Sequence, residues 1–247
     1  METFDTVNEQ IRLLQRADSL RFGTDAFLLS AFCRPDKRAE AVELGCGTGI
    51  ISLLLAARQV YRHVTAVEIQ PDMHDVACRN IAENGFSDTV SALLGDLREL
   101  SATSLGREVE VVLANPPYMR VDSGLASPSA AKQISRHEVS GGIAEFTAAA
   151  ARCLKFGGVF YTVYRPDRLE SLFAALRAHR FAPKRMVFVH DHPKKEPSMV
   201  LTEARLGAGE GLTLLPPLFL HDLAENGTPF RHLSPKAQEI YDTGRLE

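Results

Sequence analysis

The stretch "AVELGCGTGIISLLLAAR" constrains the fold more than any other part of the chain, because it reads as a strand, a glycine turn and a helix. Residues 41–44 form a short apolar strand, and residues 50–58 form an apolar helix. Between them, Gly45, Gly47 and Gly49 allow a sharp turn and let the backbone approach a ligand without a Cβ in the way. The N-terminus of the helix offers backbone N–H groups that have no partner within the helix. This unit predicts an α/β fold with a ligand site at the turn.

The same alternation of strands and helices continues along the chain. It predicts a parallel sheet that is covered by helices on both faces. The last two strands, within residues 184–206, are joined without a helix, so we expect them to be antiparallel neighbours. A helix that begins near residue 143 is expected to end at Gly157 and Gly158.

The composition limits the classes of function that the chain can have. It has 247 residues, a net charge of −3 and four scattered cysteines without a C-x-x-C pair. Nucleic-acid binding would therefore need a local basic patch, and neither a structural zinc site nor a disulfide framework is expected. The first residues are acidic and polar, and no apolar run approaches the roughly 20 residues that span a bilayer. We expect a cytoplasmic protein without a metal site.

Two acidic residues follow the glycine turn at the ends of the next two strands. Glu68 lies about 20 residues beyond the turn, where a carboxylate can accept hydrogen bonds from both ribose hydroxyls of an adenosine ligand. Asp96 ends the third strand, where a carboxylate could take the adenine amino group. In an open α/β sheet, ligands bind outside the carboxyl ends of the strands, and all three features fall there.

These features resemble the first three motifs of class I S-adenosylmethionine-dependent methyltransferases. The resemblance implies S-adenosylmethionine as the cofactor and a Rossmann-like, seven-stranded, mostly parallel sheet with an antiparallel last strand and helices on both faces. The implied cofactor-binding residues are Thr24, Asp25, Glu43, Gly45, Gly47, Gly49, Glu68, Ile69, Asp96, Leu97 and Asn115. For Thr24 and Asp25, a plain helix-capping role is an equal alternative.

The stretch "VVLANPPYMR" follows the pattern of a strand that ends in a rigid corner. Two consecutive prolines give up two backbone donors, and Asn115 is pushed toward an extended conformation because it precedes a proline. The Asn115 side-chain oxygen and the Pro116 carbonyl can each accept one N–H of a planar amino group, which aligns the nitrogen lone pair with the methyl donor. Tyr118 supplies a face for stacking. We expect Asn115, Pro116, Pro117 and Tyr118 to be the catalytic residues.

The Asn-Pro-Pro-Tyr motif resembles that of methyltransferases acting on adenine N6, cytosine N4 or the glutamine side-chain amide. The stretches "RFGTDAFLLSAF", "LANPPY", "ISRHE" and "EIYDTG" further resemble the bacterial tRNA1(Val) (adenine(37)-N6)-methyltransferase family. This implies N6-methylation of adenine 37 beside the anticodon of a valine tRNA. Three alternatives stay open: N5-glutamine methylation of a protein such as a release factor, N6-adenine methylation of rRNA or DNA, and a cofactor-binding scaffold without catalysis. Release-factor enzymes usually carry a separate helical N-terminal domain, and only about 40 residues precede the glycine turn here.

We expect three regions along the chain. Residues 1–34 form an N-terminal extension near the cofactor site, which begins with a short strand pair or an arm. Residues 35–207 form the methyltransferase domain, and residues 208–247 form a C-terminal extension of loops and a short strand.

Basic side chains are expected to contact tRNA phosphates. The candidates are Lys132, Arg136, Lys184, Arg185, Lys194 and Lys195. For His137, which is adjacent to Arg136, we favour a role in ordering the loop or contacting RNA over a role in catalysis.

Overall fold

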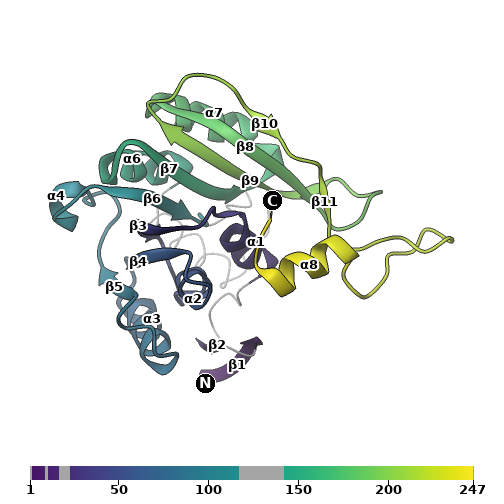
Figure 1. The fold of residues 1–247 in the computed structure, drawn as a ribbon, viewed down its shortest axis with the longest axis horizontal. Coiled ribbons are helices and arrows are strands. Elements are labelled where there is room, and N and C mark those ends of the chain that lie inside the picture. The colour runs from purple at the N-terminus through teal and green to yellow at the C-terminus, as the bar shows by residue number, and fades with distance from the viewer. Residues whose placement is uncertain (1, 9–10, 17–22, 117–141, 247) are drawn as a thin grey trace, which may run out of the picture.

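A computed structural model describes residues 2–8, 11–16, 23–116 and 142–246 of the chain (Figure 1). The main sheet has the strand order β10-β8-β9-β7-β6-β3-β4-β5, with β11 also paired to β8. The strands of this sheet are β3 (Asp36–Leu44), β4 (Tyr61–Glu68), β5 (Val90–Leu94), β6 (Val109–Ala114), β7 (Leu154–Tyr164), β8 (Phe181–His190), β9 (Pro197–Leu206), β10 (Thr213–Leu214) and β11 (Leu218–Phe219). A separate antiparallel pair is formed by β1 (Glu2–Asn8) and β2 (Ile11–Arg16).

Helices connect most of these strands. They are α1 (Thr24–Phe32), α2 (Ile50–Ala57), α3 (Pro71–Glu83), α4 (Ala102–Leu105), α6 (Ile143–Cys153), the 3-10 helix η1 (Pro166–Arg168), α7 (Leu169–Ala178) and α8 (Pro235–Thr243). Within the described ranges, no helix has the length and apolar character needed to cross a membrane.

The strand directions confirm the expected class of fold. Strands β5, β4, β3, β6 and β7 are parallel neighbours, and β9 is antiparallel to both β7 and β8. The seven strands from β3 to β9 therefore form the predicted mostly parallel sheet with an antiparallel last strand. The two-residue strands β10 and β11 extend it at the β8 edge.

Two apolar cores cover the two faces of the sheet. On β6, Val111 and Leu113 belong to the core formed with α1, α2 and α3, whereas Val112 and Ala114 belong to the core formed with α6 and α7. This alternation follows from the two-residue period of a strand, which is buried on both sides here. The same period places residue 115 on the face that α1 covers.

The glycine pair after α6 does not have the role that we predicted. The helix ends at Cys153 and β7 begins at Leu154, so Gly157 and Gly158 lie inside the strand. The register with β6 shifts there, because Val109 pairs with Leu154 while Val111 pairs with Val159. A Cβ on Gly158 would lie 2.9 Å from the Lys155 carbonyl oxygen. The glycines thus permit a tight bend at the start of the strand rather than the end of a helix.

The C-terminal extension contains a helix that we did not predict. Ser234 accepts a hydrogen bond from the Ala237 N–H, Pro235 begins α8, and Gly244 ends it with φ of +65°. The Tyr241 ring on α8 stacks on Phe27 of α1 at 4.1 Å between ring centroids. The Leu246 N–H also donates to the Ala31 carbonyl. Thus α8 and the residues after it are attached to α1.

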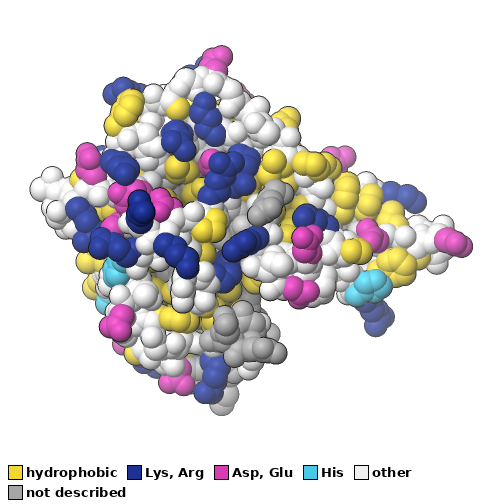
Figure 2. All heavy atoms as spheres, in the orientation of Figure 1, with side chains coloured by type: hydrophobic (Ala, Val, Ile, Leu, Met, Phe, Trp, Pro, Cys, Tyr) yellow, Lys and Arg dark blue, Asp and Glu magenta, His cyan; other side chains and the backbone are white. Residues whose placement is uncertain are grey.

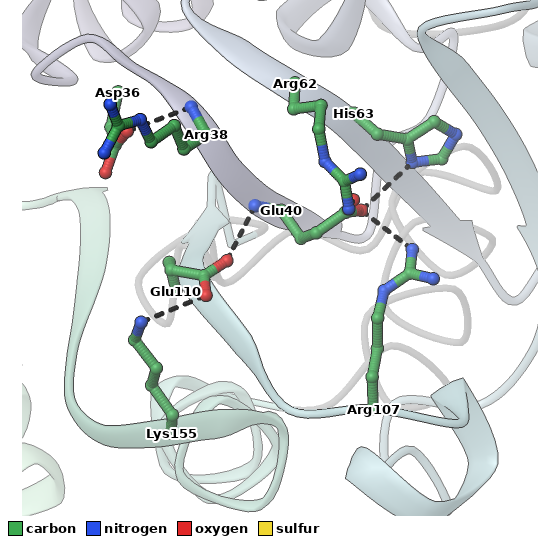
Figure 3. Close-up of polar contacts among 8 residues, drawn as sticks. All are labelled: Asp36, Arg38, Glu40, Arg62, His63, Arg107, Glu110 and Lys155. Carbon is green, nitrogen blue, oxygen red and sulfur yellow. Dashed lines mark hydrogen bonds and ion pairs between the residues drawn. The ribbon is translucent and has the colours of Figure 1, made fainter.

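A polar cluster joins the amino ends of β3, β4 and β6 (Figure 3). The Glu40 carboxylate pairs with Arg62 and, at 2.8 Å, with Arg107, and the Glu40 N–H donates to Glu110. Lys155 pairs with the other oxygen of Glu110 at 3.0 Å. This cluster lies at the opposite edge of the sheet from the predicted site and holds the strand beginnings together.

Candidate active site

The residues that the sequence pattern singled out gather at the carboxyl edge of the sheet. Leu44, the last residue of β3, pairs with Val67 on one side and with Ala114 on the other. Glu68 at the end of β4 pairs with Leu94 at the end of β5. The turn after β3 therefore lies between Glu68 and Asn115, as the parallel order requires.

The glycine turn is held from the side by Glu68. Gly45, Gly47 and Gly49 all have positive φ, at +68°, +56° and +80°, which explains why glycine stands at each position. One Glu68 carboxylate oxygen accepts the Gly47 N–H at 2.9 Å, and the other accepts the Gln70 N–H at 2.9 Å. The side chain thus fixes the turn and the start of α3, a role that we did not foresee for it.

Glu43 supports the turn from beneath. It is 1% exposed and accepts both the backbone N–H and the hydroxyl of Ser52, in the first turns of α2. Burial raises the pKa of the Glu43 carboxyl to about 7, although the Ser52 hydrogen bonds act in the opposite direction. Because its side chain is enclosed, Glu43 can act on a bound molecule only through the turn.

Asp96 follows β5 and is paired with Arg98. The Arg98 Nε donates to both Asp96 carboxylate oxygens, at 2.9 and 2.8 Å, and these hydrogen bonds lower the pKa of Asp96. The Asp96 side chain is 22% exposed, whereas the neighbouring Leu97 is buried. Ile69, after Glu68, is half-buried.

Asn115 contacts the N-terminal helix. Its side-chain Nδ2 donates to Asp25 Oδ2 at 3.0 Å, and the other oxygen of Asp25 accepts the Ala26 N–H at 2.9 Å. The N-cap of α1 is Gly23, which has no side chain to accept a capping hydrogen bond. Thr24 is half-buried at the first helical position. The Asp25 carboxylate thus links α1 to the Asn-Pro-Pro-Tyr corner, where Pro116 is buried.

Several predicted residues lie outside the described part of the chain. These are Pro117, Tyr118, Lys132, Arg136 and His137.

The prediction that Arg185 contacts tRNA is wrong. Arg185 is 7% exposed, its Nε lies 3.0 Å from the buried Glu203 carboxylate, and its guanidinium lies 4.1 Å above the Phe32 ring. The buried carboxylate therefore holds this cation inside the protein. A pattern of charged residues on a strand cannot show which of them face a buried acid.

The other basic candidates near the last hairpin stay at the surface. Lys184 donates to the Gly209 and Glu210 carbonyls, whereas Lys194 and Lys195 are exposed in the β8–β9 turn. That turn follows the carboxyl end of β8, which runs in the same direction as β6, so it lies at the edge that carries Asn115. Elsewhere, Lys and Arg side chains gather across the middle of the face in Figure 2, with acidic side chains among them.

Comparisons with solved structures agree with this fold. A predicted O-methyltransferase from Agrobacterium tumefaciens matches with a TM-score of 0.72 at 22% identity, over 91% of this chain and 98% of that one. A Pyrococcus horikoshii protein solved in complex with MeSAdo matches with a TM-score of 0.56 at 15% identity, over 84% and 72%. The sheet order and the glycine turn are those of the class I methyltransferase fold.

The family follows from sequence comparison. Residues 17–179 match the model of the methyltransferase small domain, and the chain belongs to this family. A Porphyromonas gingivalis protein named tRNA1(Val) (adenine(37)-N6)-methyltransferase is 30% identical over 77% of this chain and 76% of its own length. A Phocaeicola vulgatus protein of the same name is 31% identical over 74% and 76%.

The raised pKa of Glu43 predicts a specific dependence of stability on pH. Between its ordinary value of 4.5 and about 7, the unfolded chain loses a proton that the folded protein keeps. This group therefore lowers the free energy of unfolding as pH rises through that window, by about 3 kcal/mol in total. Glu43→Gln removes the titration, so its stability relative to wild type should rise by a similar amount from pH 4.5 to pH 8.

The measurement is urea unfolding of both proteins across this pH range. Glu239→Gln is the matched control, at a side chain that is 58% exposed. Its free energy of unfolding should change with pH in parallel with that of wild type. If the free energies of unfolding of Glu43→Gln and wild type instead changed with pH in parallel, the prediction would be contradicted, because the Glu43 carboxyl would then have the same pKa in the folded and unfolded protein.

Proposed function

We propose that this protein transfers a methyl group from S-adenosylmethionine to N6 of adenine 37 in tRNA1(Val). The observation that carries the proposal is the position of Asn115, which opens the Asn-Pro-Pro-Tyr corner directly beside the glycine turn. The names of the relatives supply the nucleotide and the tRNA. A tRNA substrate places the reaction in the cytoplasm.

The residues at the carboxyl edge fit S-adenosylmethionine. Among the described residues, and apart from its two chain neighbours, no atom lies within 4 Å of a Cβ built on Gly47, so this side of the turn has space against which a ligand can lie. Glu68 Oε2 accepts the Gly47 N–H, and Oε1 accepts the Gln70 backbone N–H together with a longer contact from the Gln70 side chain at 3.5 Å. A ribose hydroxyl would bind the remaining lone pair of Oε2 and replace the Gln70 side chain at Oε1. Asp96 is partly exposed and would accept a hydrogen bond from the adenine amino group. Ile69 and Leu97 would lie beside the adenine. The bound cofactor supplies an electrophilic methyl group on a sulfonium.

The corner after β6 supplies two hydrogen-bond acceptors for the acceptor amino group and a ring for stacking. An exocyclic amino group is a poor nucleophile while its lone pair is delocalised into the base. The Asn115 side-chain oxygen and the Pro116 carbonyl would accept its two N–H groups, which holds the lone pair toward the methyl group. They would also stabilise the positive charge that develops on nitrogen as the N–CH3 bond forms and the S–CH3 bond breaks, with neutral S-adenosylhomocysteine as the leaving group. The methylated nitrogen would then release one proton to water. Tyr118 would stack on the base, which has to leave its own stack to reach the site.

The test is methyl transfer from labelled S-adenosylmethionine to total tRNA from cells that lack this protein. We expect N6-methyladenosine at position 37 of one valine tRNA, and Asn115→Ala should reduce kcat by about 100-fold or more with cofactor affinity little changed. A glutamine amide has the same two N–H donors, so release factor is assayed in parallel. Label in release factor, rRNA or DNA instead of tRNA would overturn the acceptor. No transfer to any of these would overturn the enzyme assignment.

The open side of the glycine turn predicts the effect of a single methyl group. Gly47→Ala places a Cβ in the space proposed for the cofactor, and its positive φ adds strain of about 1–2 kcal/mol. We expect the Kd for S-adenosylhomocysteine, measured by calorimetry, to rise at least about 10-fold, or about 1.4 kcal/mol.

Gly106 offers a matched control. It also has positive φ, +74°, and no atom of the described residues, apart from its chain neighbours, lies within 4 Å of its Cβ position. It ends α4, however, which leads to the amino end of β6. Gly106→Ala should lose similar stability and keep the wild-type Kd. An unchanged Kd in Gly47→Ala would place the cofactor elsewhere.

The exposed lysines of the β8–β9 turn are proposed to contact tRNA phosphates. About three strand spacings, roughly 14 Å, separate β8 from β6, which is within reach of an anticodon stem. The double reversal Lys194→Glu and Lys195→Glu should weaken tRNA binding and lower the slope of log K against log salt by roughly 1 to 2.

The control makes the same change of charge at the opposite edge. Lys37→Glu with Arg38→Glu alters exposed residues at the start of β3 and should leave tRNA affinity close to wild type. If the two double variants lost the same tRNA affinity, the loss would come from the change in net charge alone, and the proposed contact would be abandoned.

A further inference from the structure

The hydrogen bond between Asn115 and Asp25 determines which way the Asn115 amide faces. A side-chain amide has a carbonyl oxygen that accepts and an NH2 group that donates. An ionised carboxylate can only accept, so Asp25 selects the orientation in which Nδ2 faces it, at 3.0 Å from Oδ2. The Asn115 Oδ1 is consequently directed away from α1. The opposite orientation would set two oxygens against each other.

The Asp25 carboxylate is itself held in place. Its Oδ1 accepts the N–H of Ala26, and α1 is anchored by Phe27, Leu28 and Leu29, which are buried in the core. Gly23 leaves room for this arrangement, because a Cβ there would lie only 2.7 Å from Asp25 Oδ1. The backbone of Gly23 is extended, with φ of −113° and ψ of 178°, so its conformation does not require glycine. A side chain at this position would instead make the Asp25 carboxylate shift from its present place.

We infer that Asp25 is a positioning residue for methyl transfer: it holds the Asn115 amide with Oδ1 presented to the acceptor amino group. This inference rests on the proposed function, in which that oxygen accepts an N–H of the acceptor. In the opposite orientation, the NH2 group of Asn115 would face the N–H groups of the substrate and repel them. The negative charge of Asp25 also polarises the amide, which strengthens Oδ1 as an acceptor while positive charge develops on the acceptor nitrogen.

The first test is a double-mutant cycle on kcat with the variants Asp25→Ala, Asn115→Ala and the pair. We expect Asp25→Ala to lower kcat by about 10- to 100-fold, with the KM for tRNA and the Kd for S-adenosylhomocysteine within about 3-fold of wild type. If Asp25 acts through Asn115, adding Asp25→Ala to Asn115→Ala should change the residual rate less than 3-fold. Independent, multiplicative losses would overturn the inference. So would a loss confined to cofactor affinity, which would make Asp25 a cofactor ligand.

Two milder variants test the same idea without removing the side chain. Asp25→Asn keeps an oxygen that can accept the Asn115 N–H but lacks the charge that selects it, so kcat should lie between those of wild type and Asp25→Ala. Gly23→Ala displaces the carboxylate while Asp25 remains, and it should lower kcat in the same direction. Wild-type kcat in both would contradict the positioning role.

Glu170→Ala is the matched control. It removes an exposed acid from the first turn of α7 and should leave kcat unchanged. Thermal unfolding of every variant separates lost activity from lost folding.

The two proposals fail in different ways. The cycle is measured with tRNA and, in parallel, with release factor. If the proposed acceptor is wrong, the label moves to the other substrate while the coupling between Asp25 and Asn115 persists. If the role of Asp25 is wrong, the wild type still methylates tRNA but the coupling disappears.

Discussion

The hydrogen bond from the Gly47 N–H to Glu68 is the contact on which the rest of the site depends. It joins the turn after β3 to the end of β4 at the middle one of three glycines, all of which have the positive φ that glycine adopts readily. An ionised acceptor makes such a bond stronger than a bond between neutral groups. The same carboxylate holds the start of α3, so one side chain sets both walls of the space proposed for the cofactor.

The functional side chains share one face of the sheet because strands have a two-residue period. Glu43 and Asn115 lie on the face covered by α1 and α2, as Val111 and Leu113 do on β6. Glu43 contacts α2 from beneath the turn, and Asn115 contacts α1. The opposite face, against α6 and α7, holds an apolar core with no part in the proposed chemistry. Both faces therefore carry an apolar core, and the side chains proposed for the site lie on the face covered by α1 and α2.

Local patterns predicted the parts of this protein that depend on neighbouring residues. The glycine turn, the strand directions and the common edge of Glu68, Asp96 and Asn115 all follow from periodicity and from the rule that parallel strands end together. The burial of Arg185 could not be predicted in this way, because its partner Glu203 lies on another strand and only the folded sheet brings them together. The contact between Asp25 and Asn115 spans 90 residues and was invisible for the same reason.

Two further elements were predicted wrongly because the residues that mark them are compatible with more than one local structure. Gly157 and Gly158 can end a helix or allow a bend in a strand, and only the register with β6 shows which applies. The start of α8 carried a plain signal in Ser234 and Pro235, which we read as part of a loop.

The attachment of α8 to α1 has a consequence for how this protein can be divided. The family model ends at residue 179, yet the ring of Tyr241 and the backbone of Leu246 hold the helix that carries Asp25. The residues from α8 onward therefore help to hold α1, and with it the Asp25 side chain, in place. A fragment trimmed to the family boundaries would retain the glycine turn and Asn115 but would lose the contacts that hold the helix orienting Asn115.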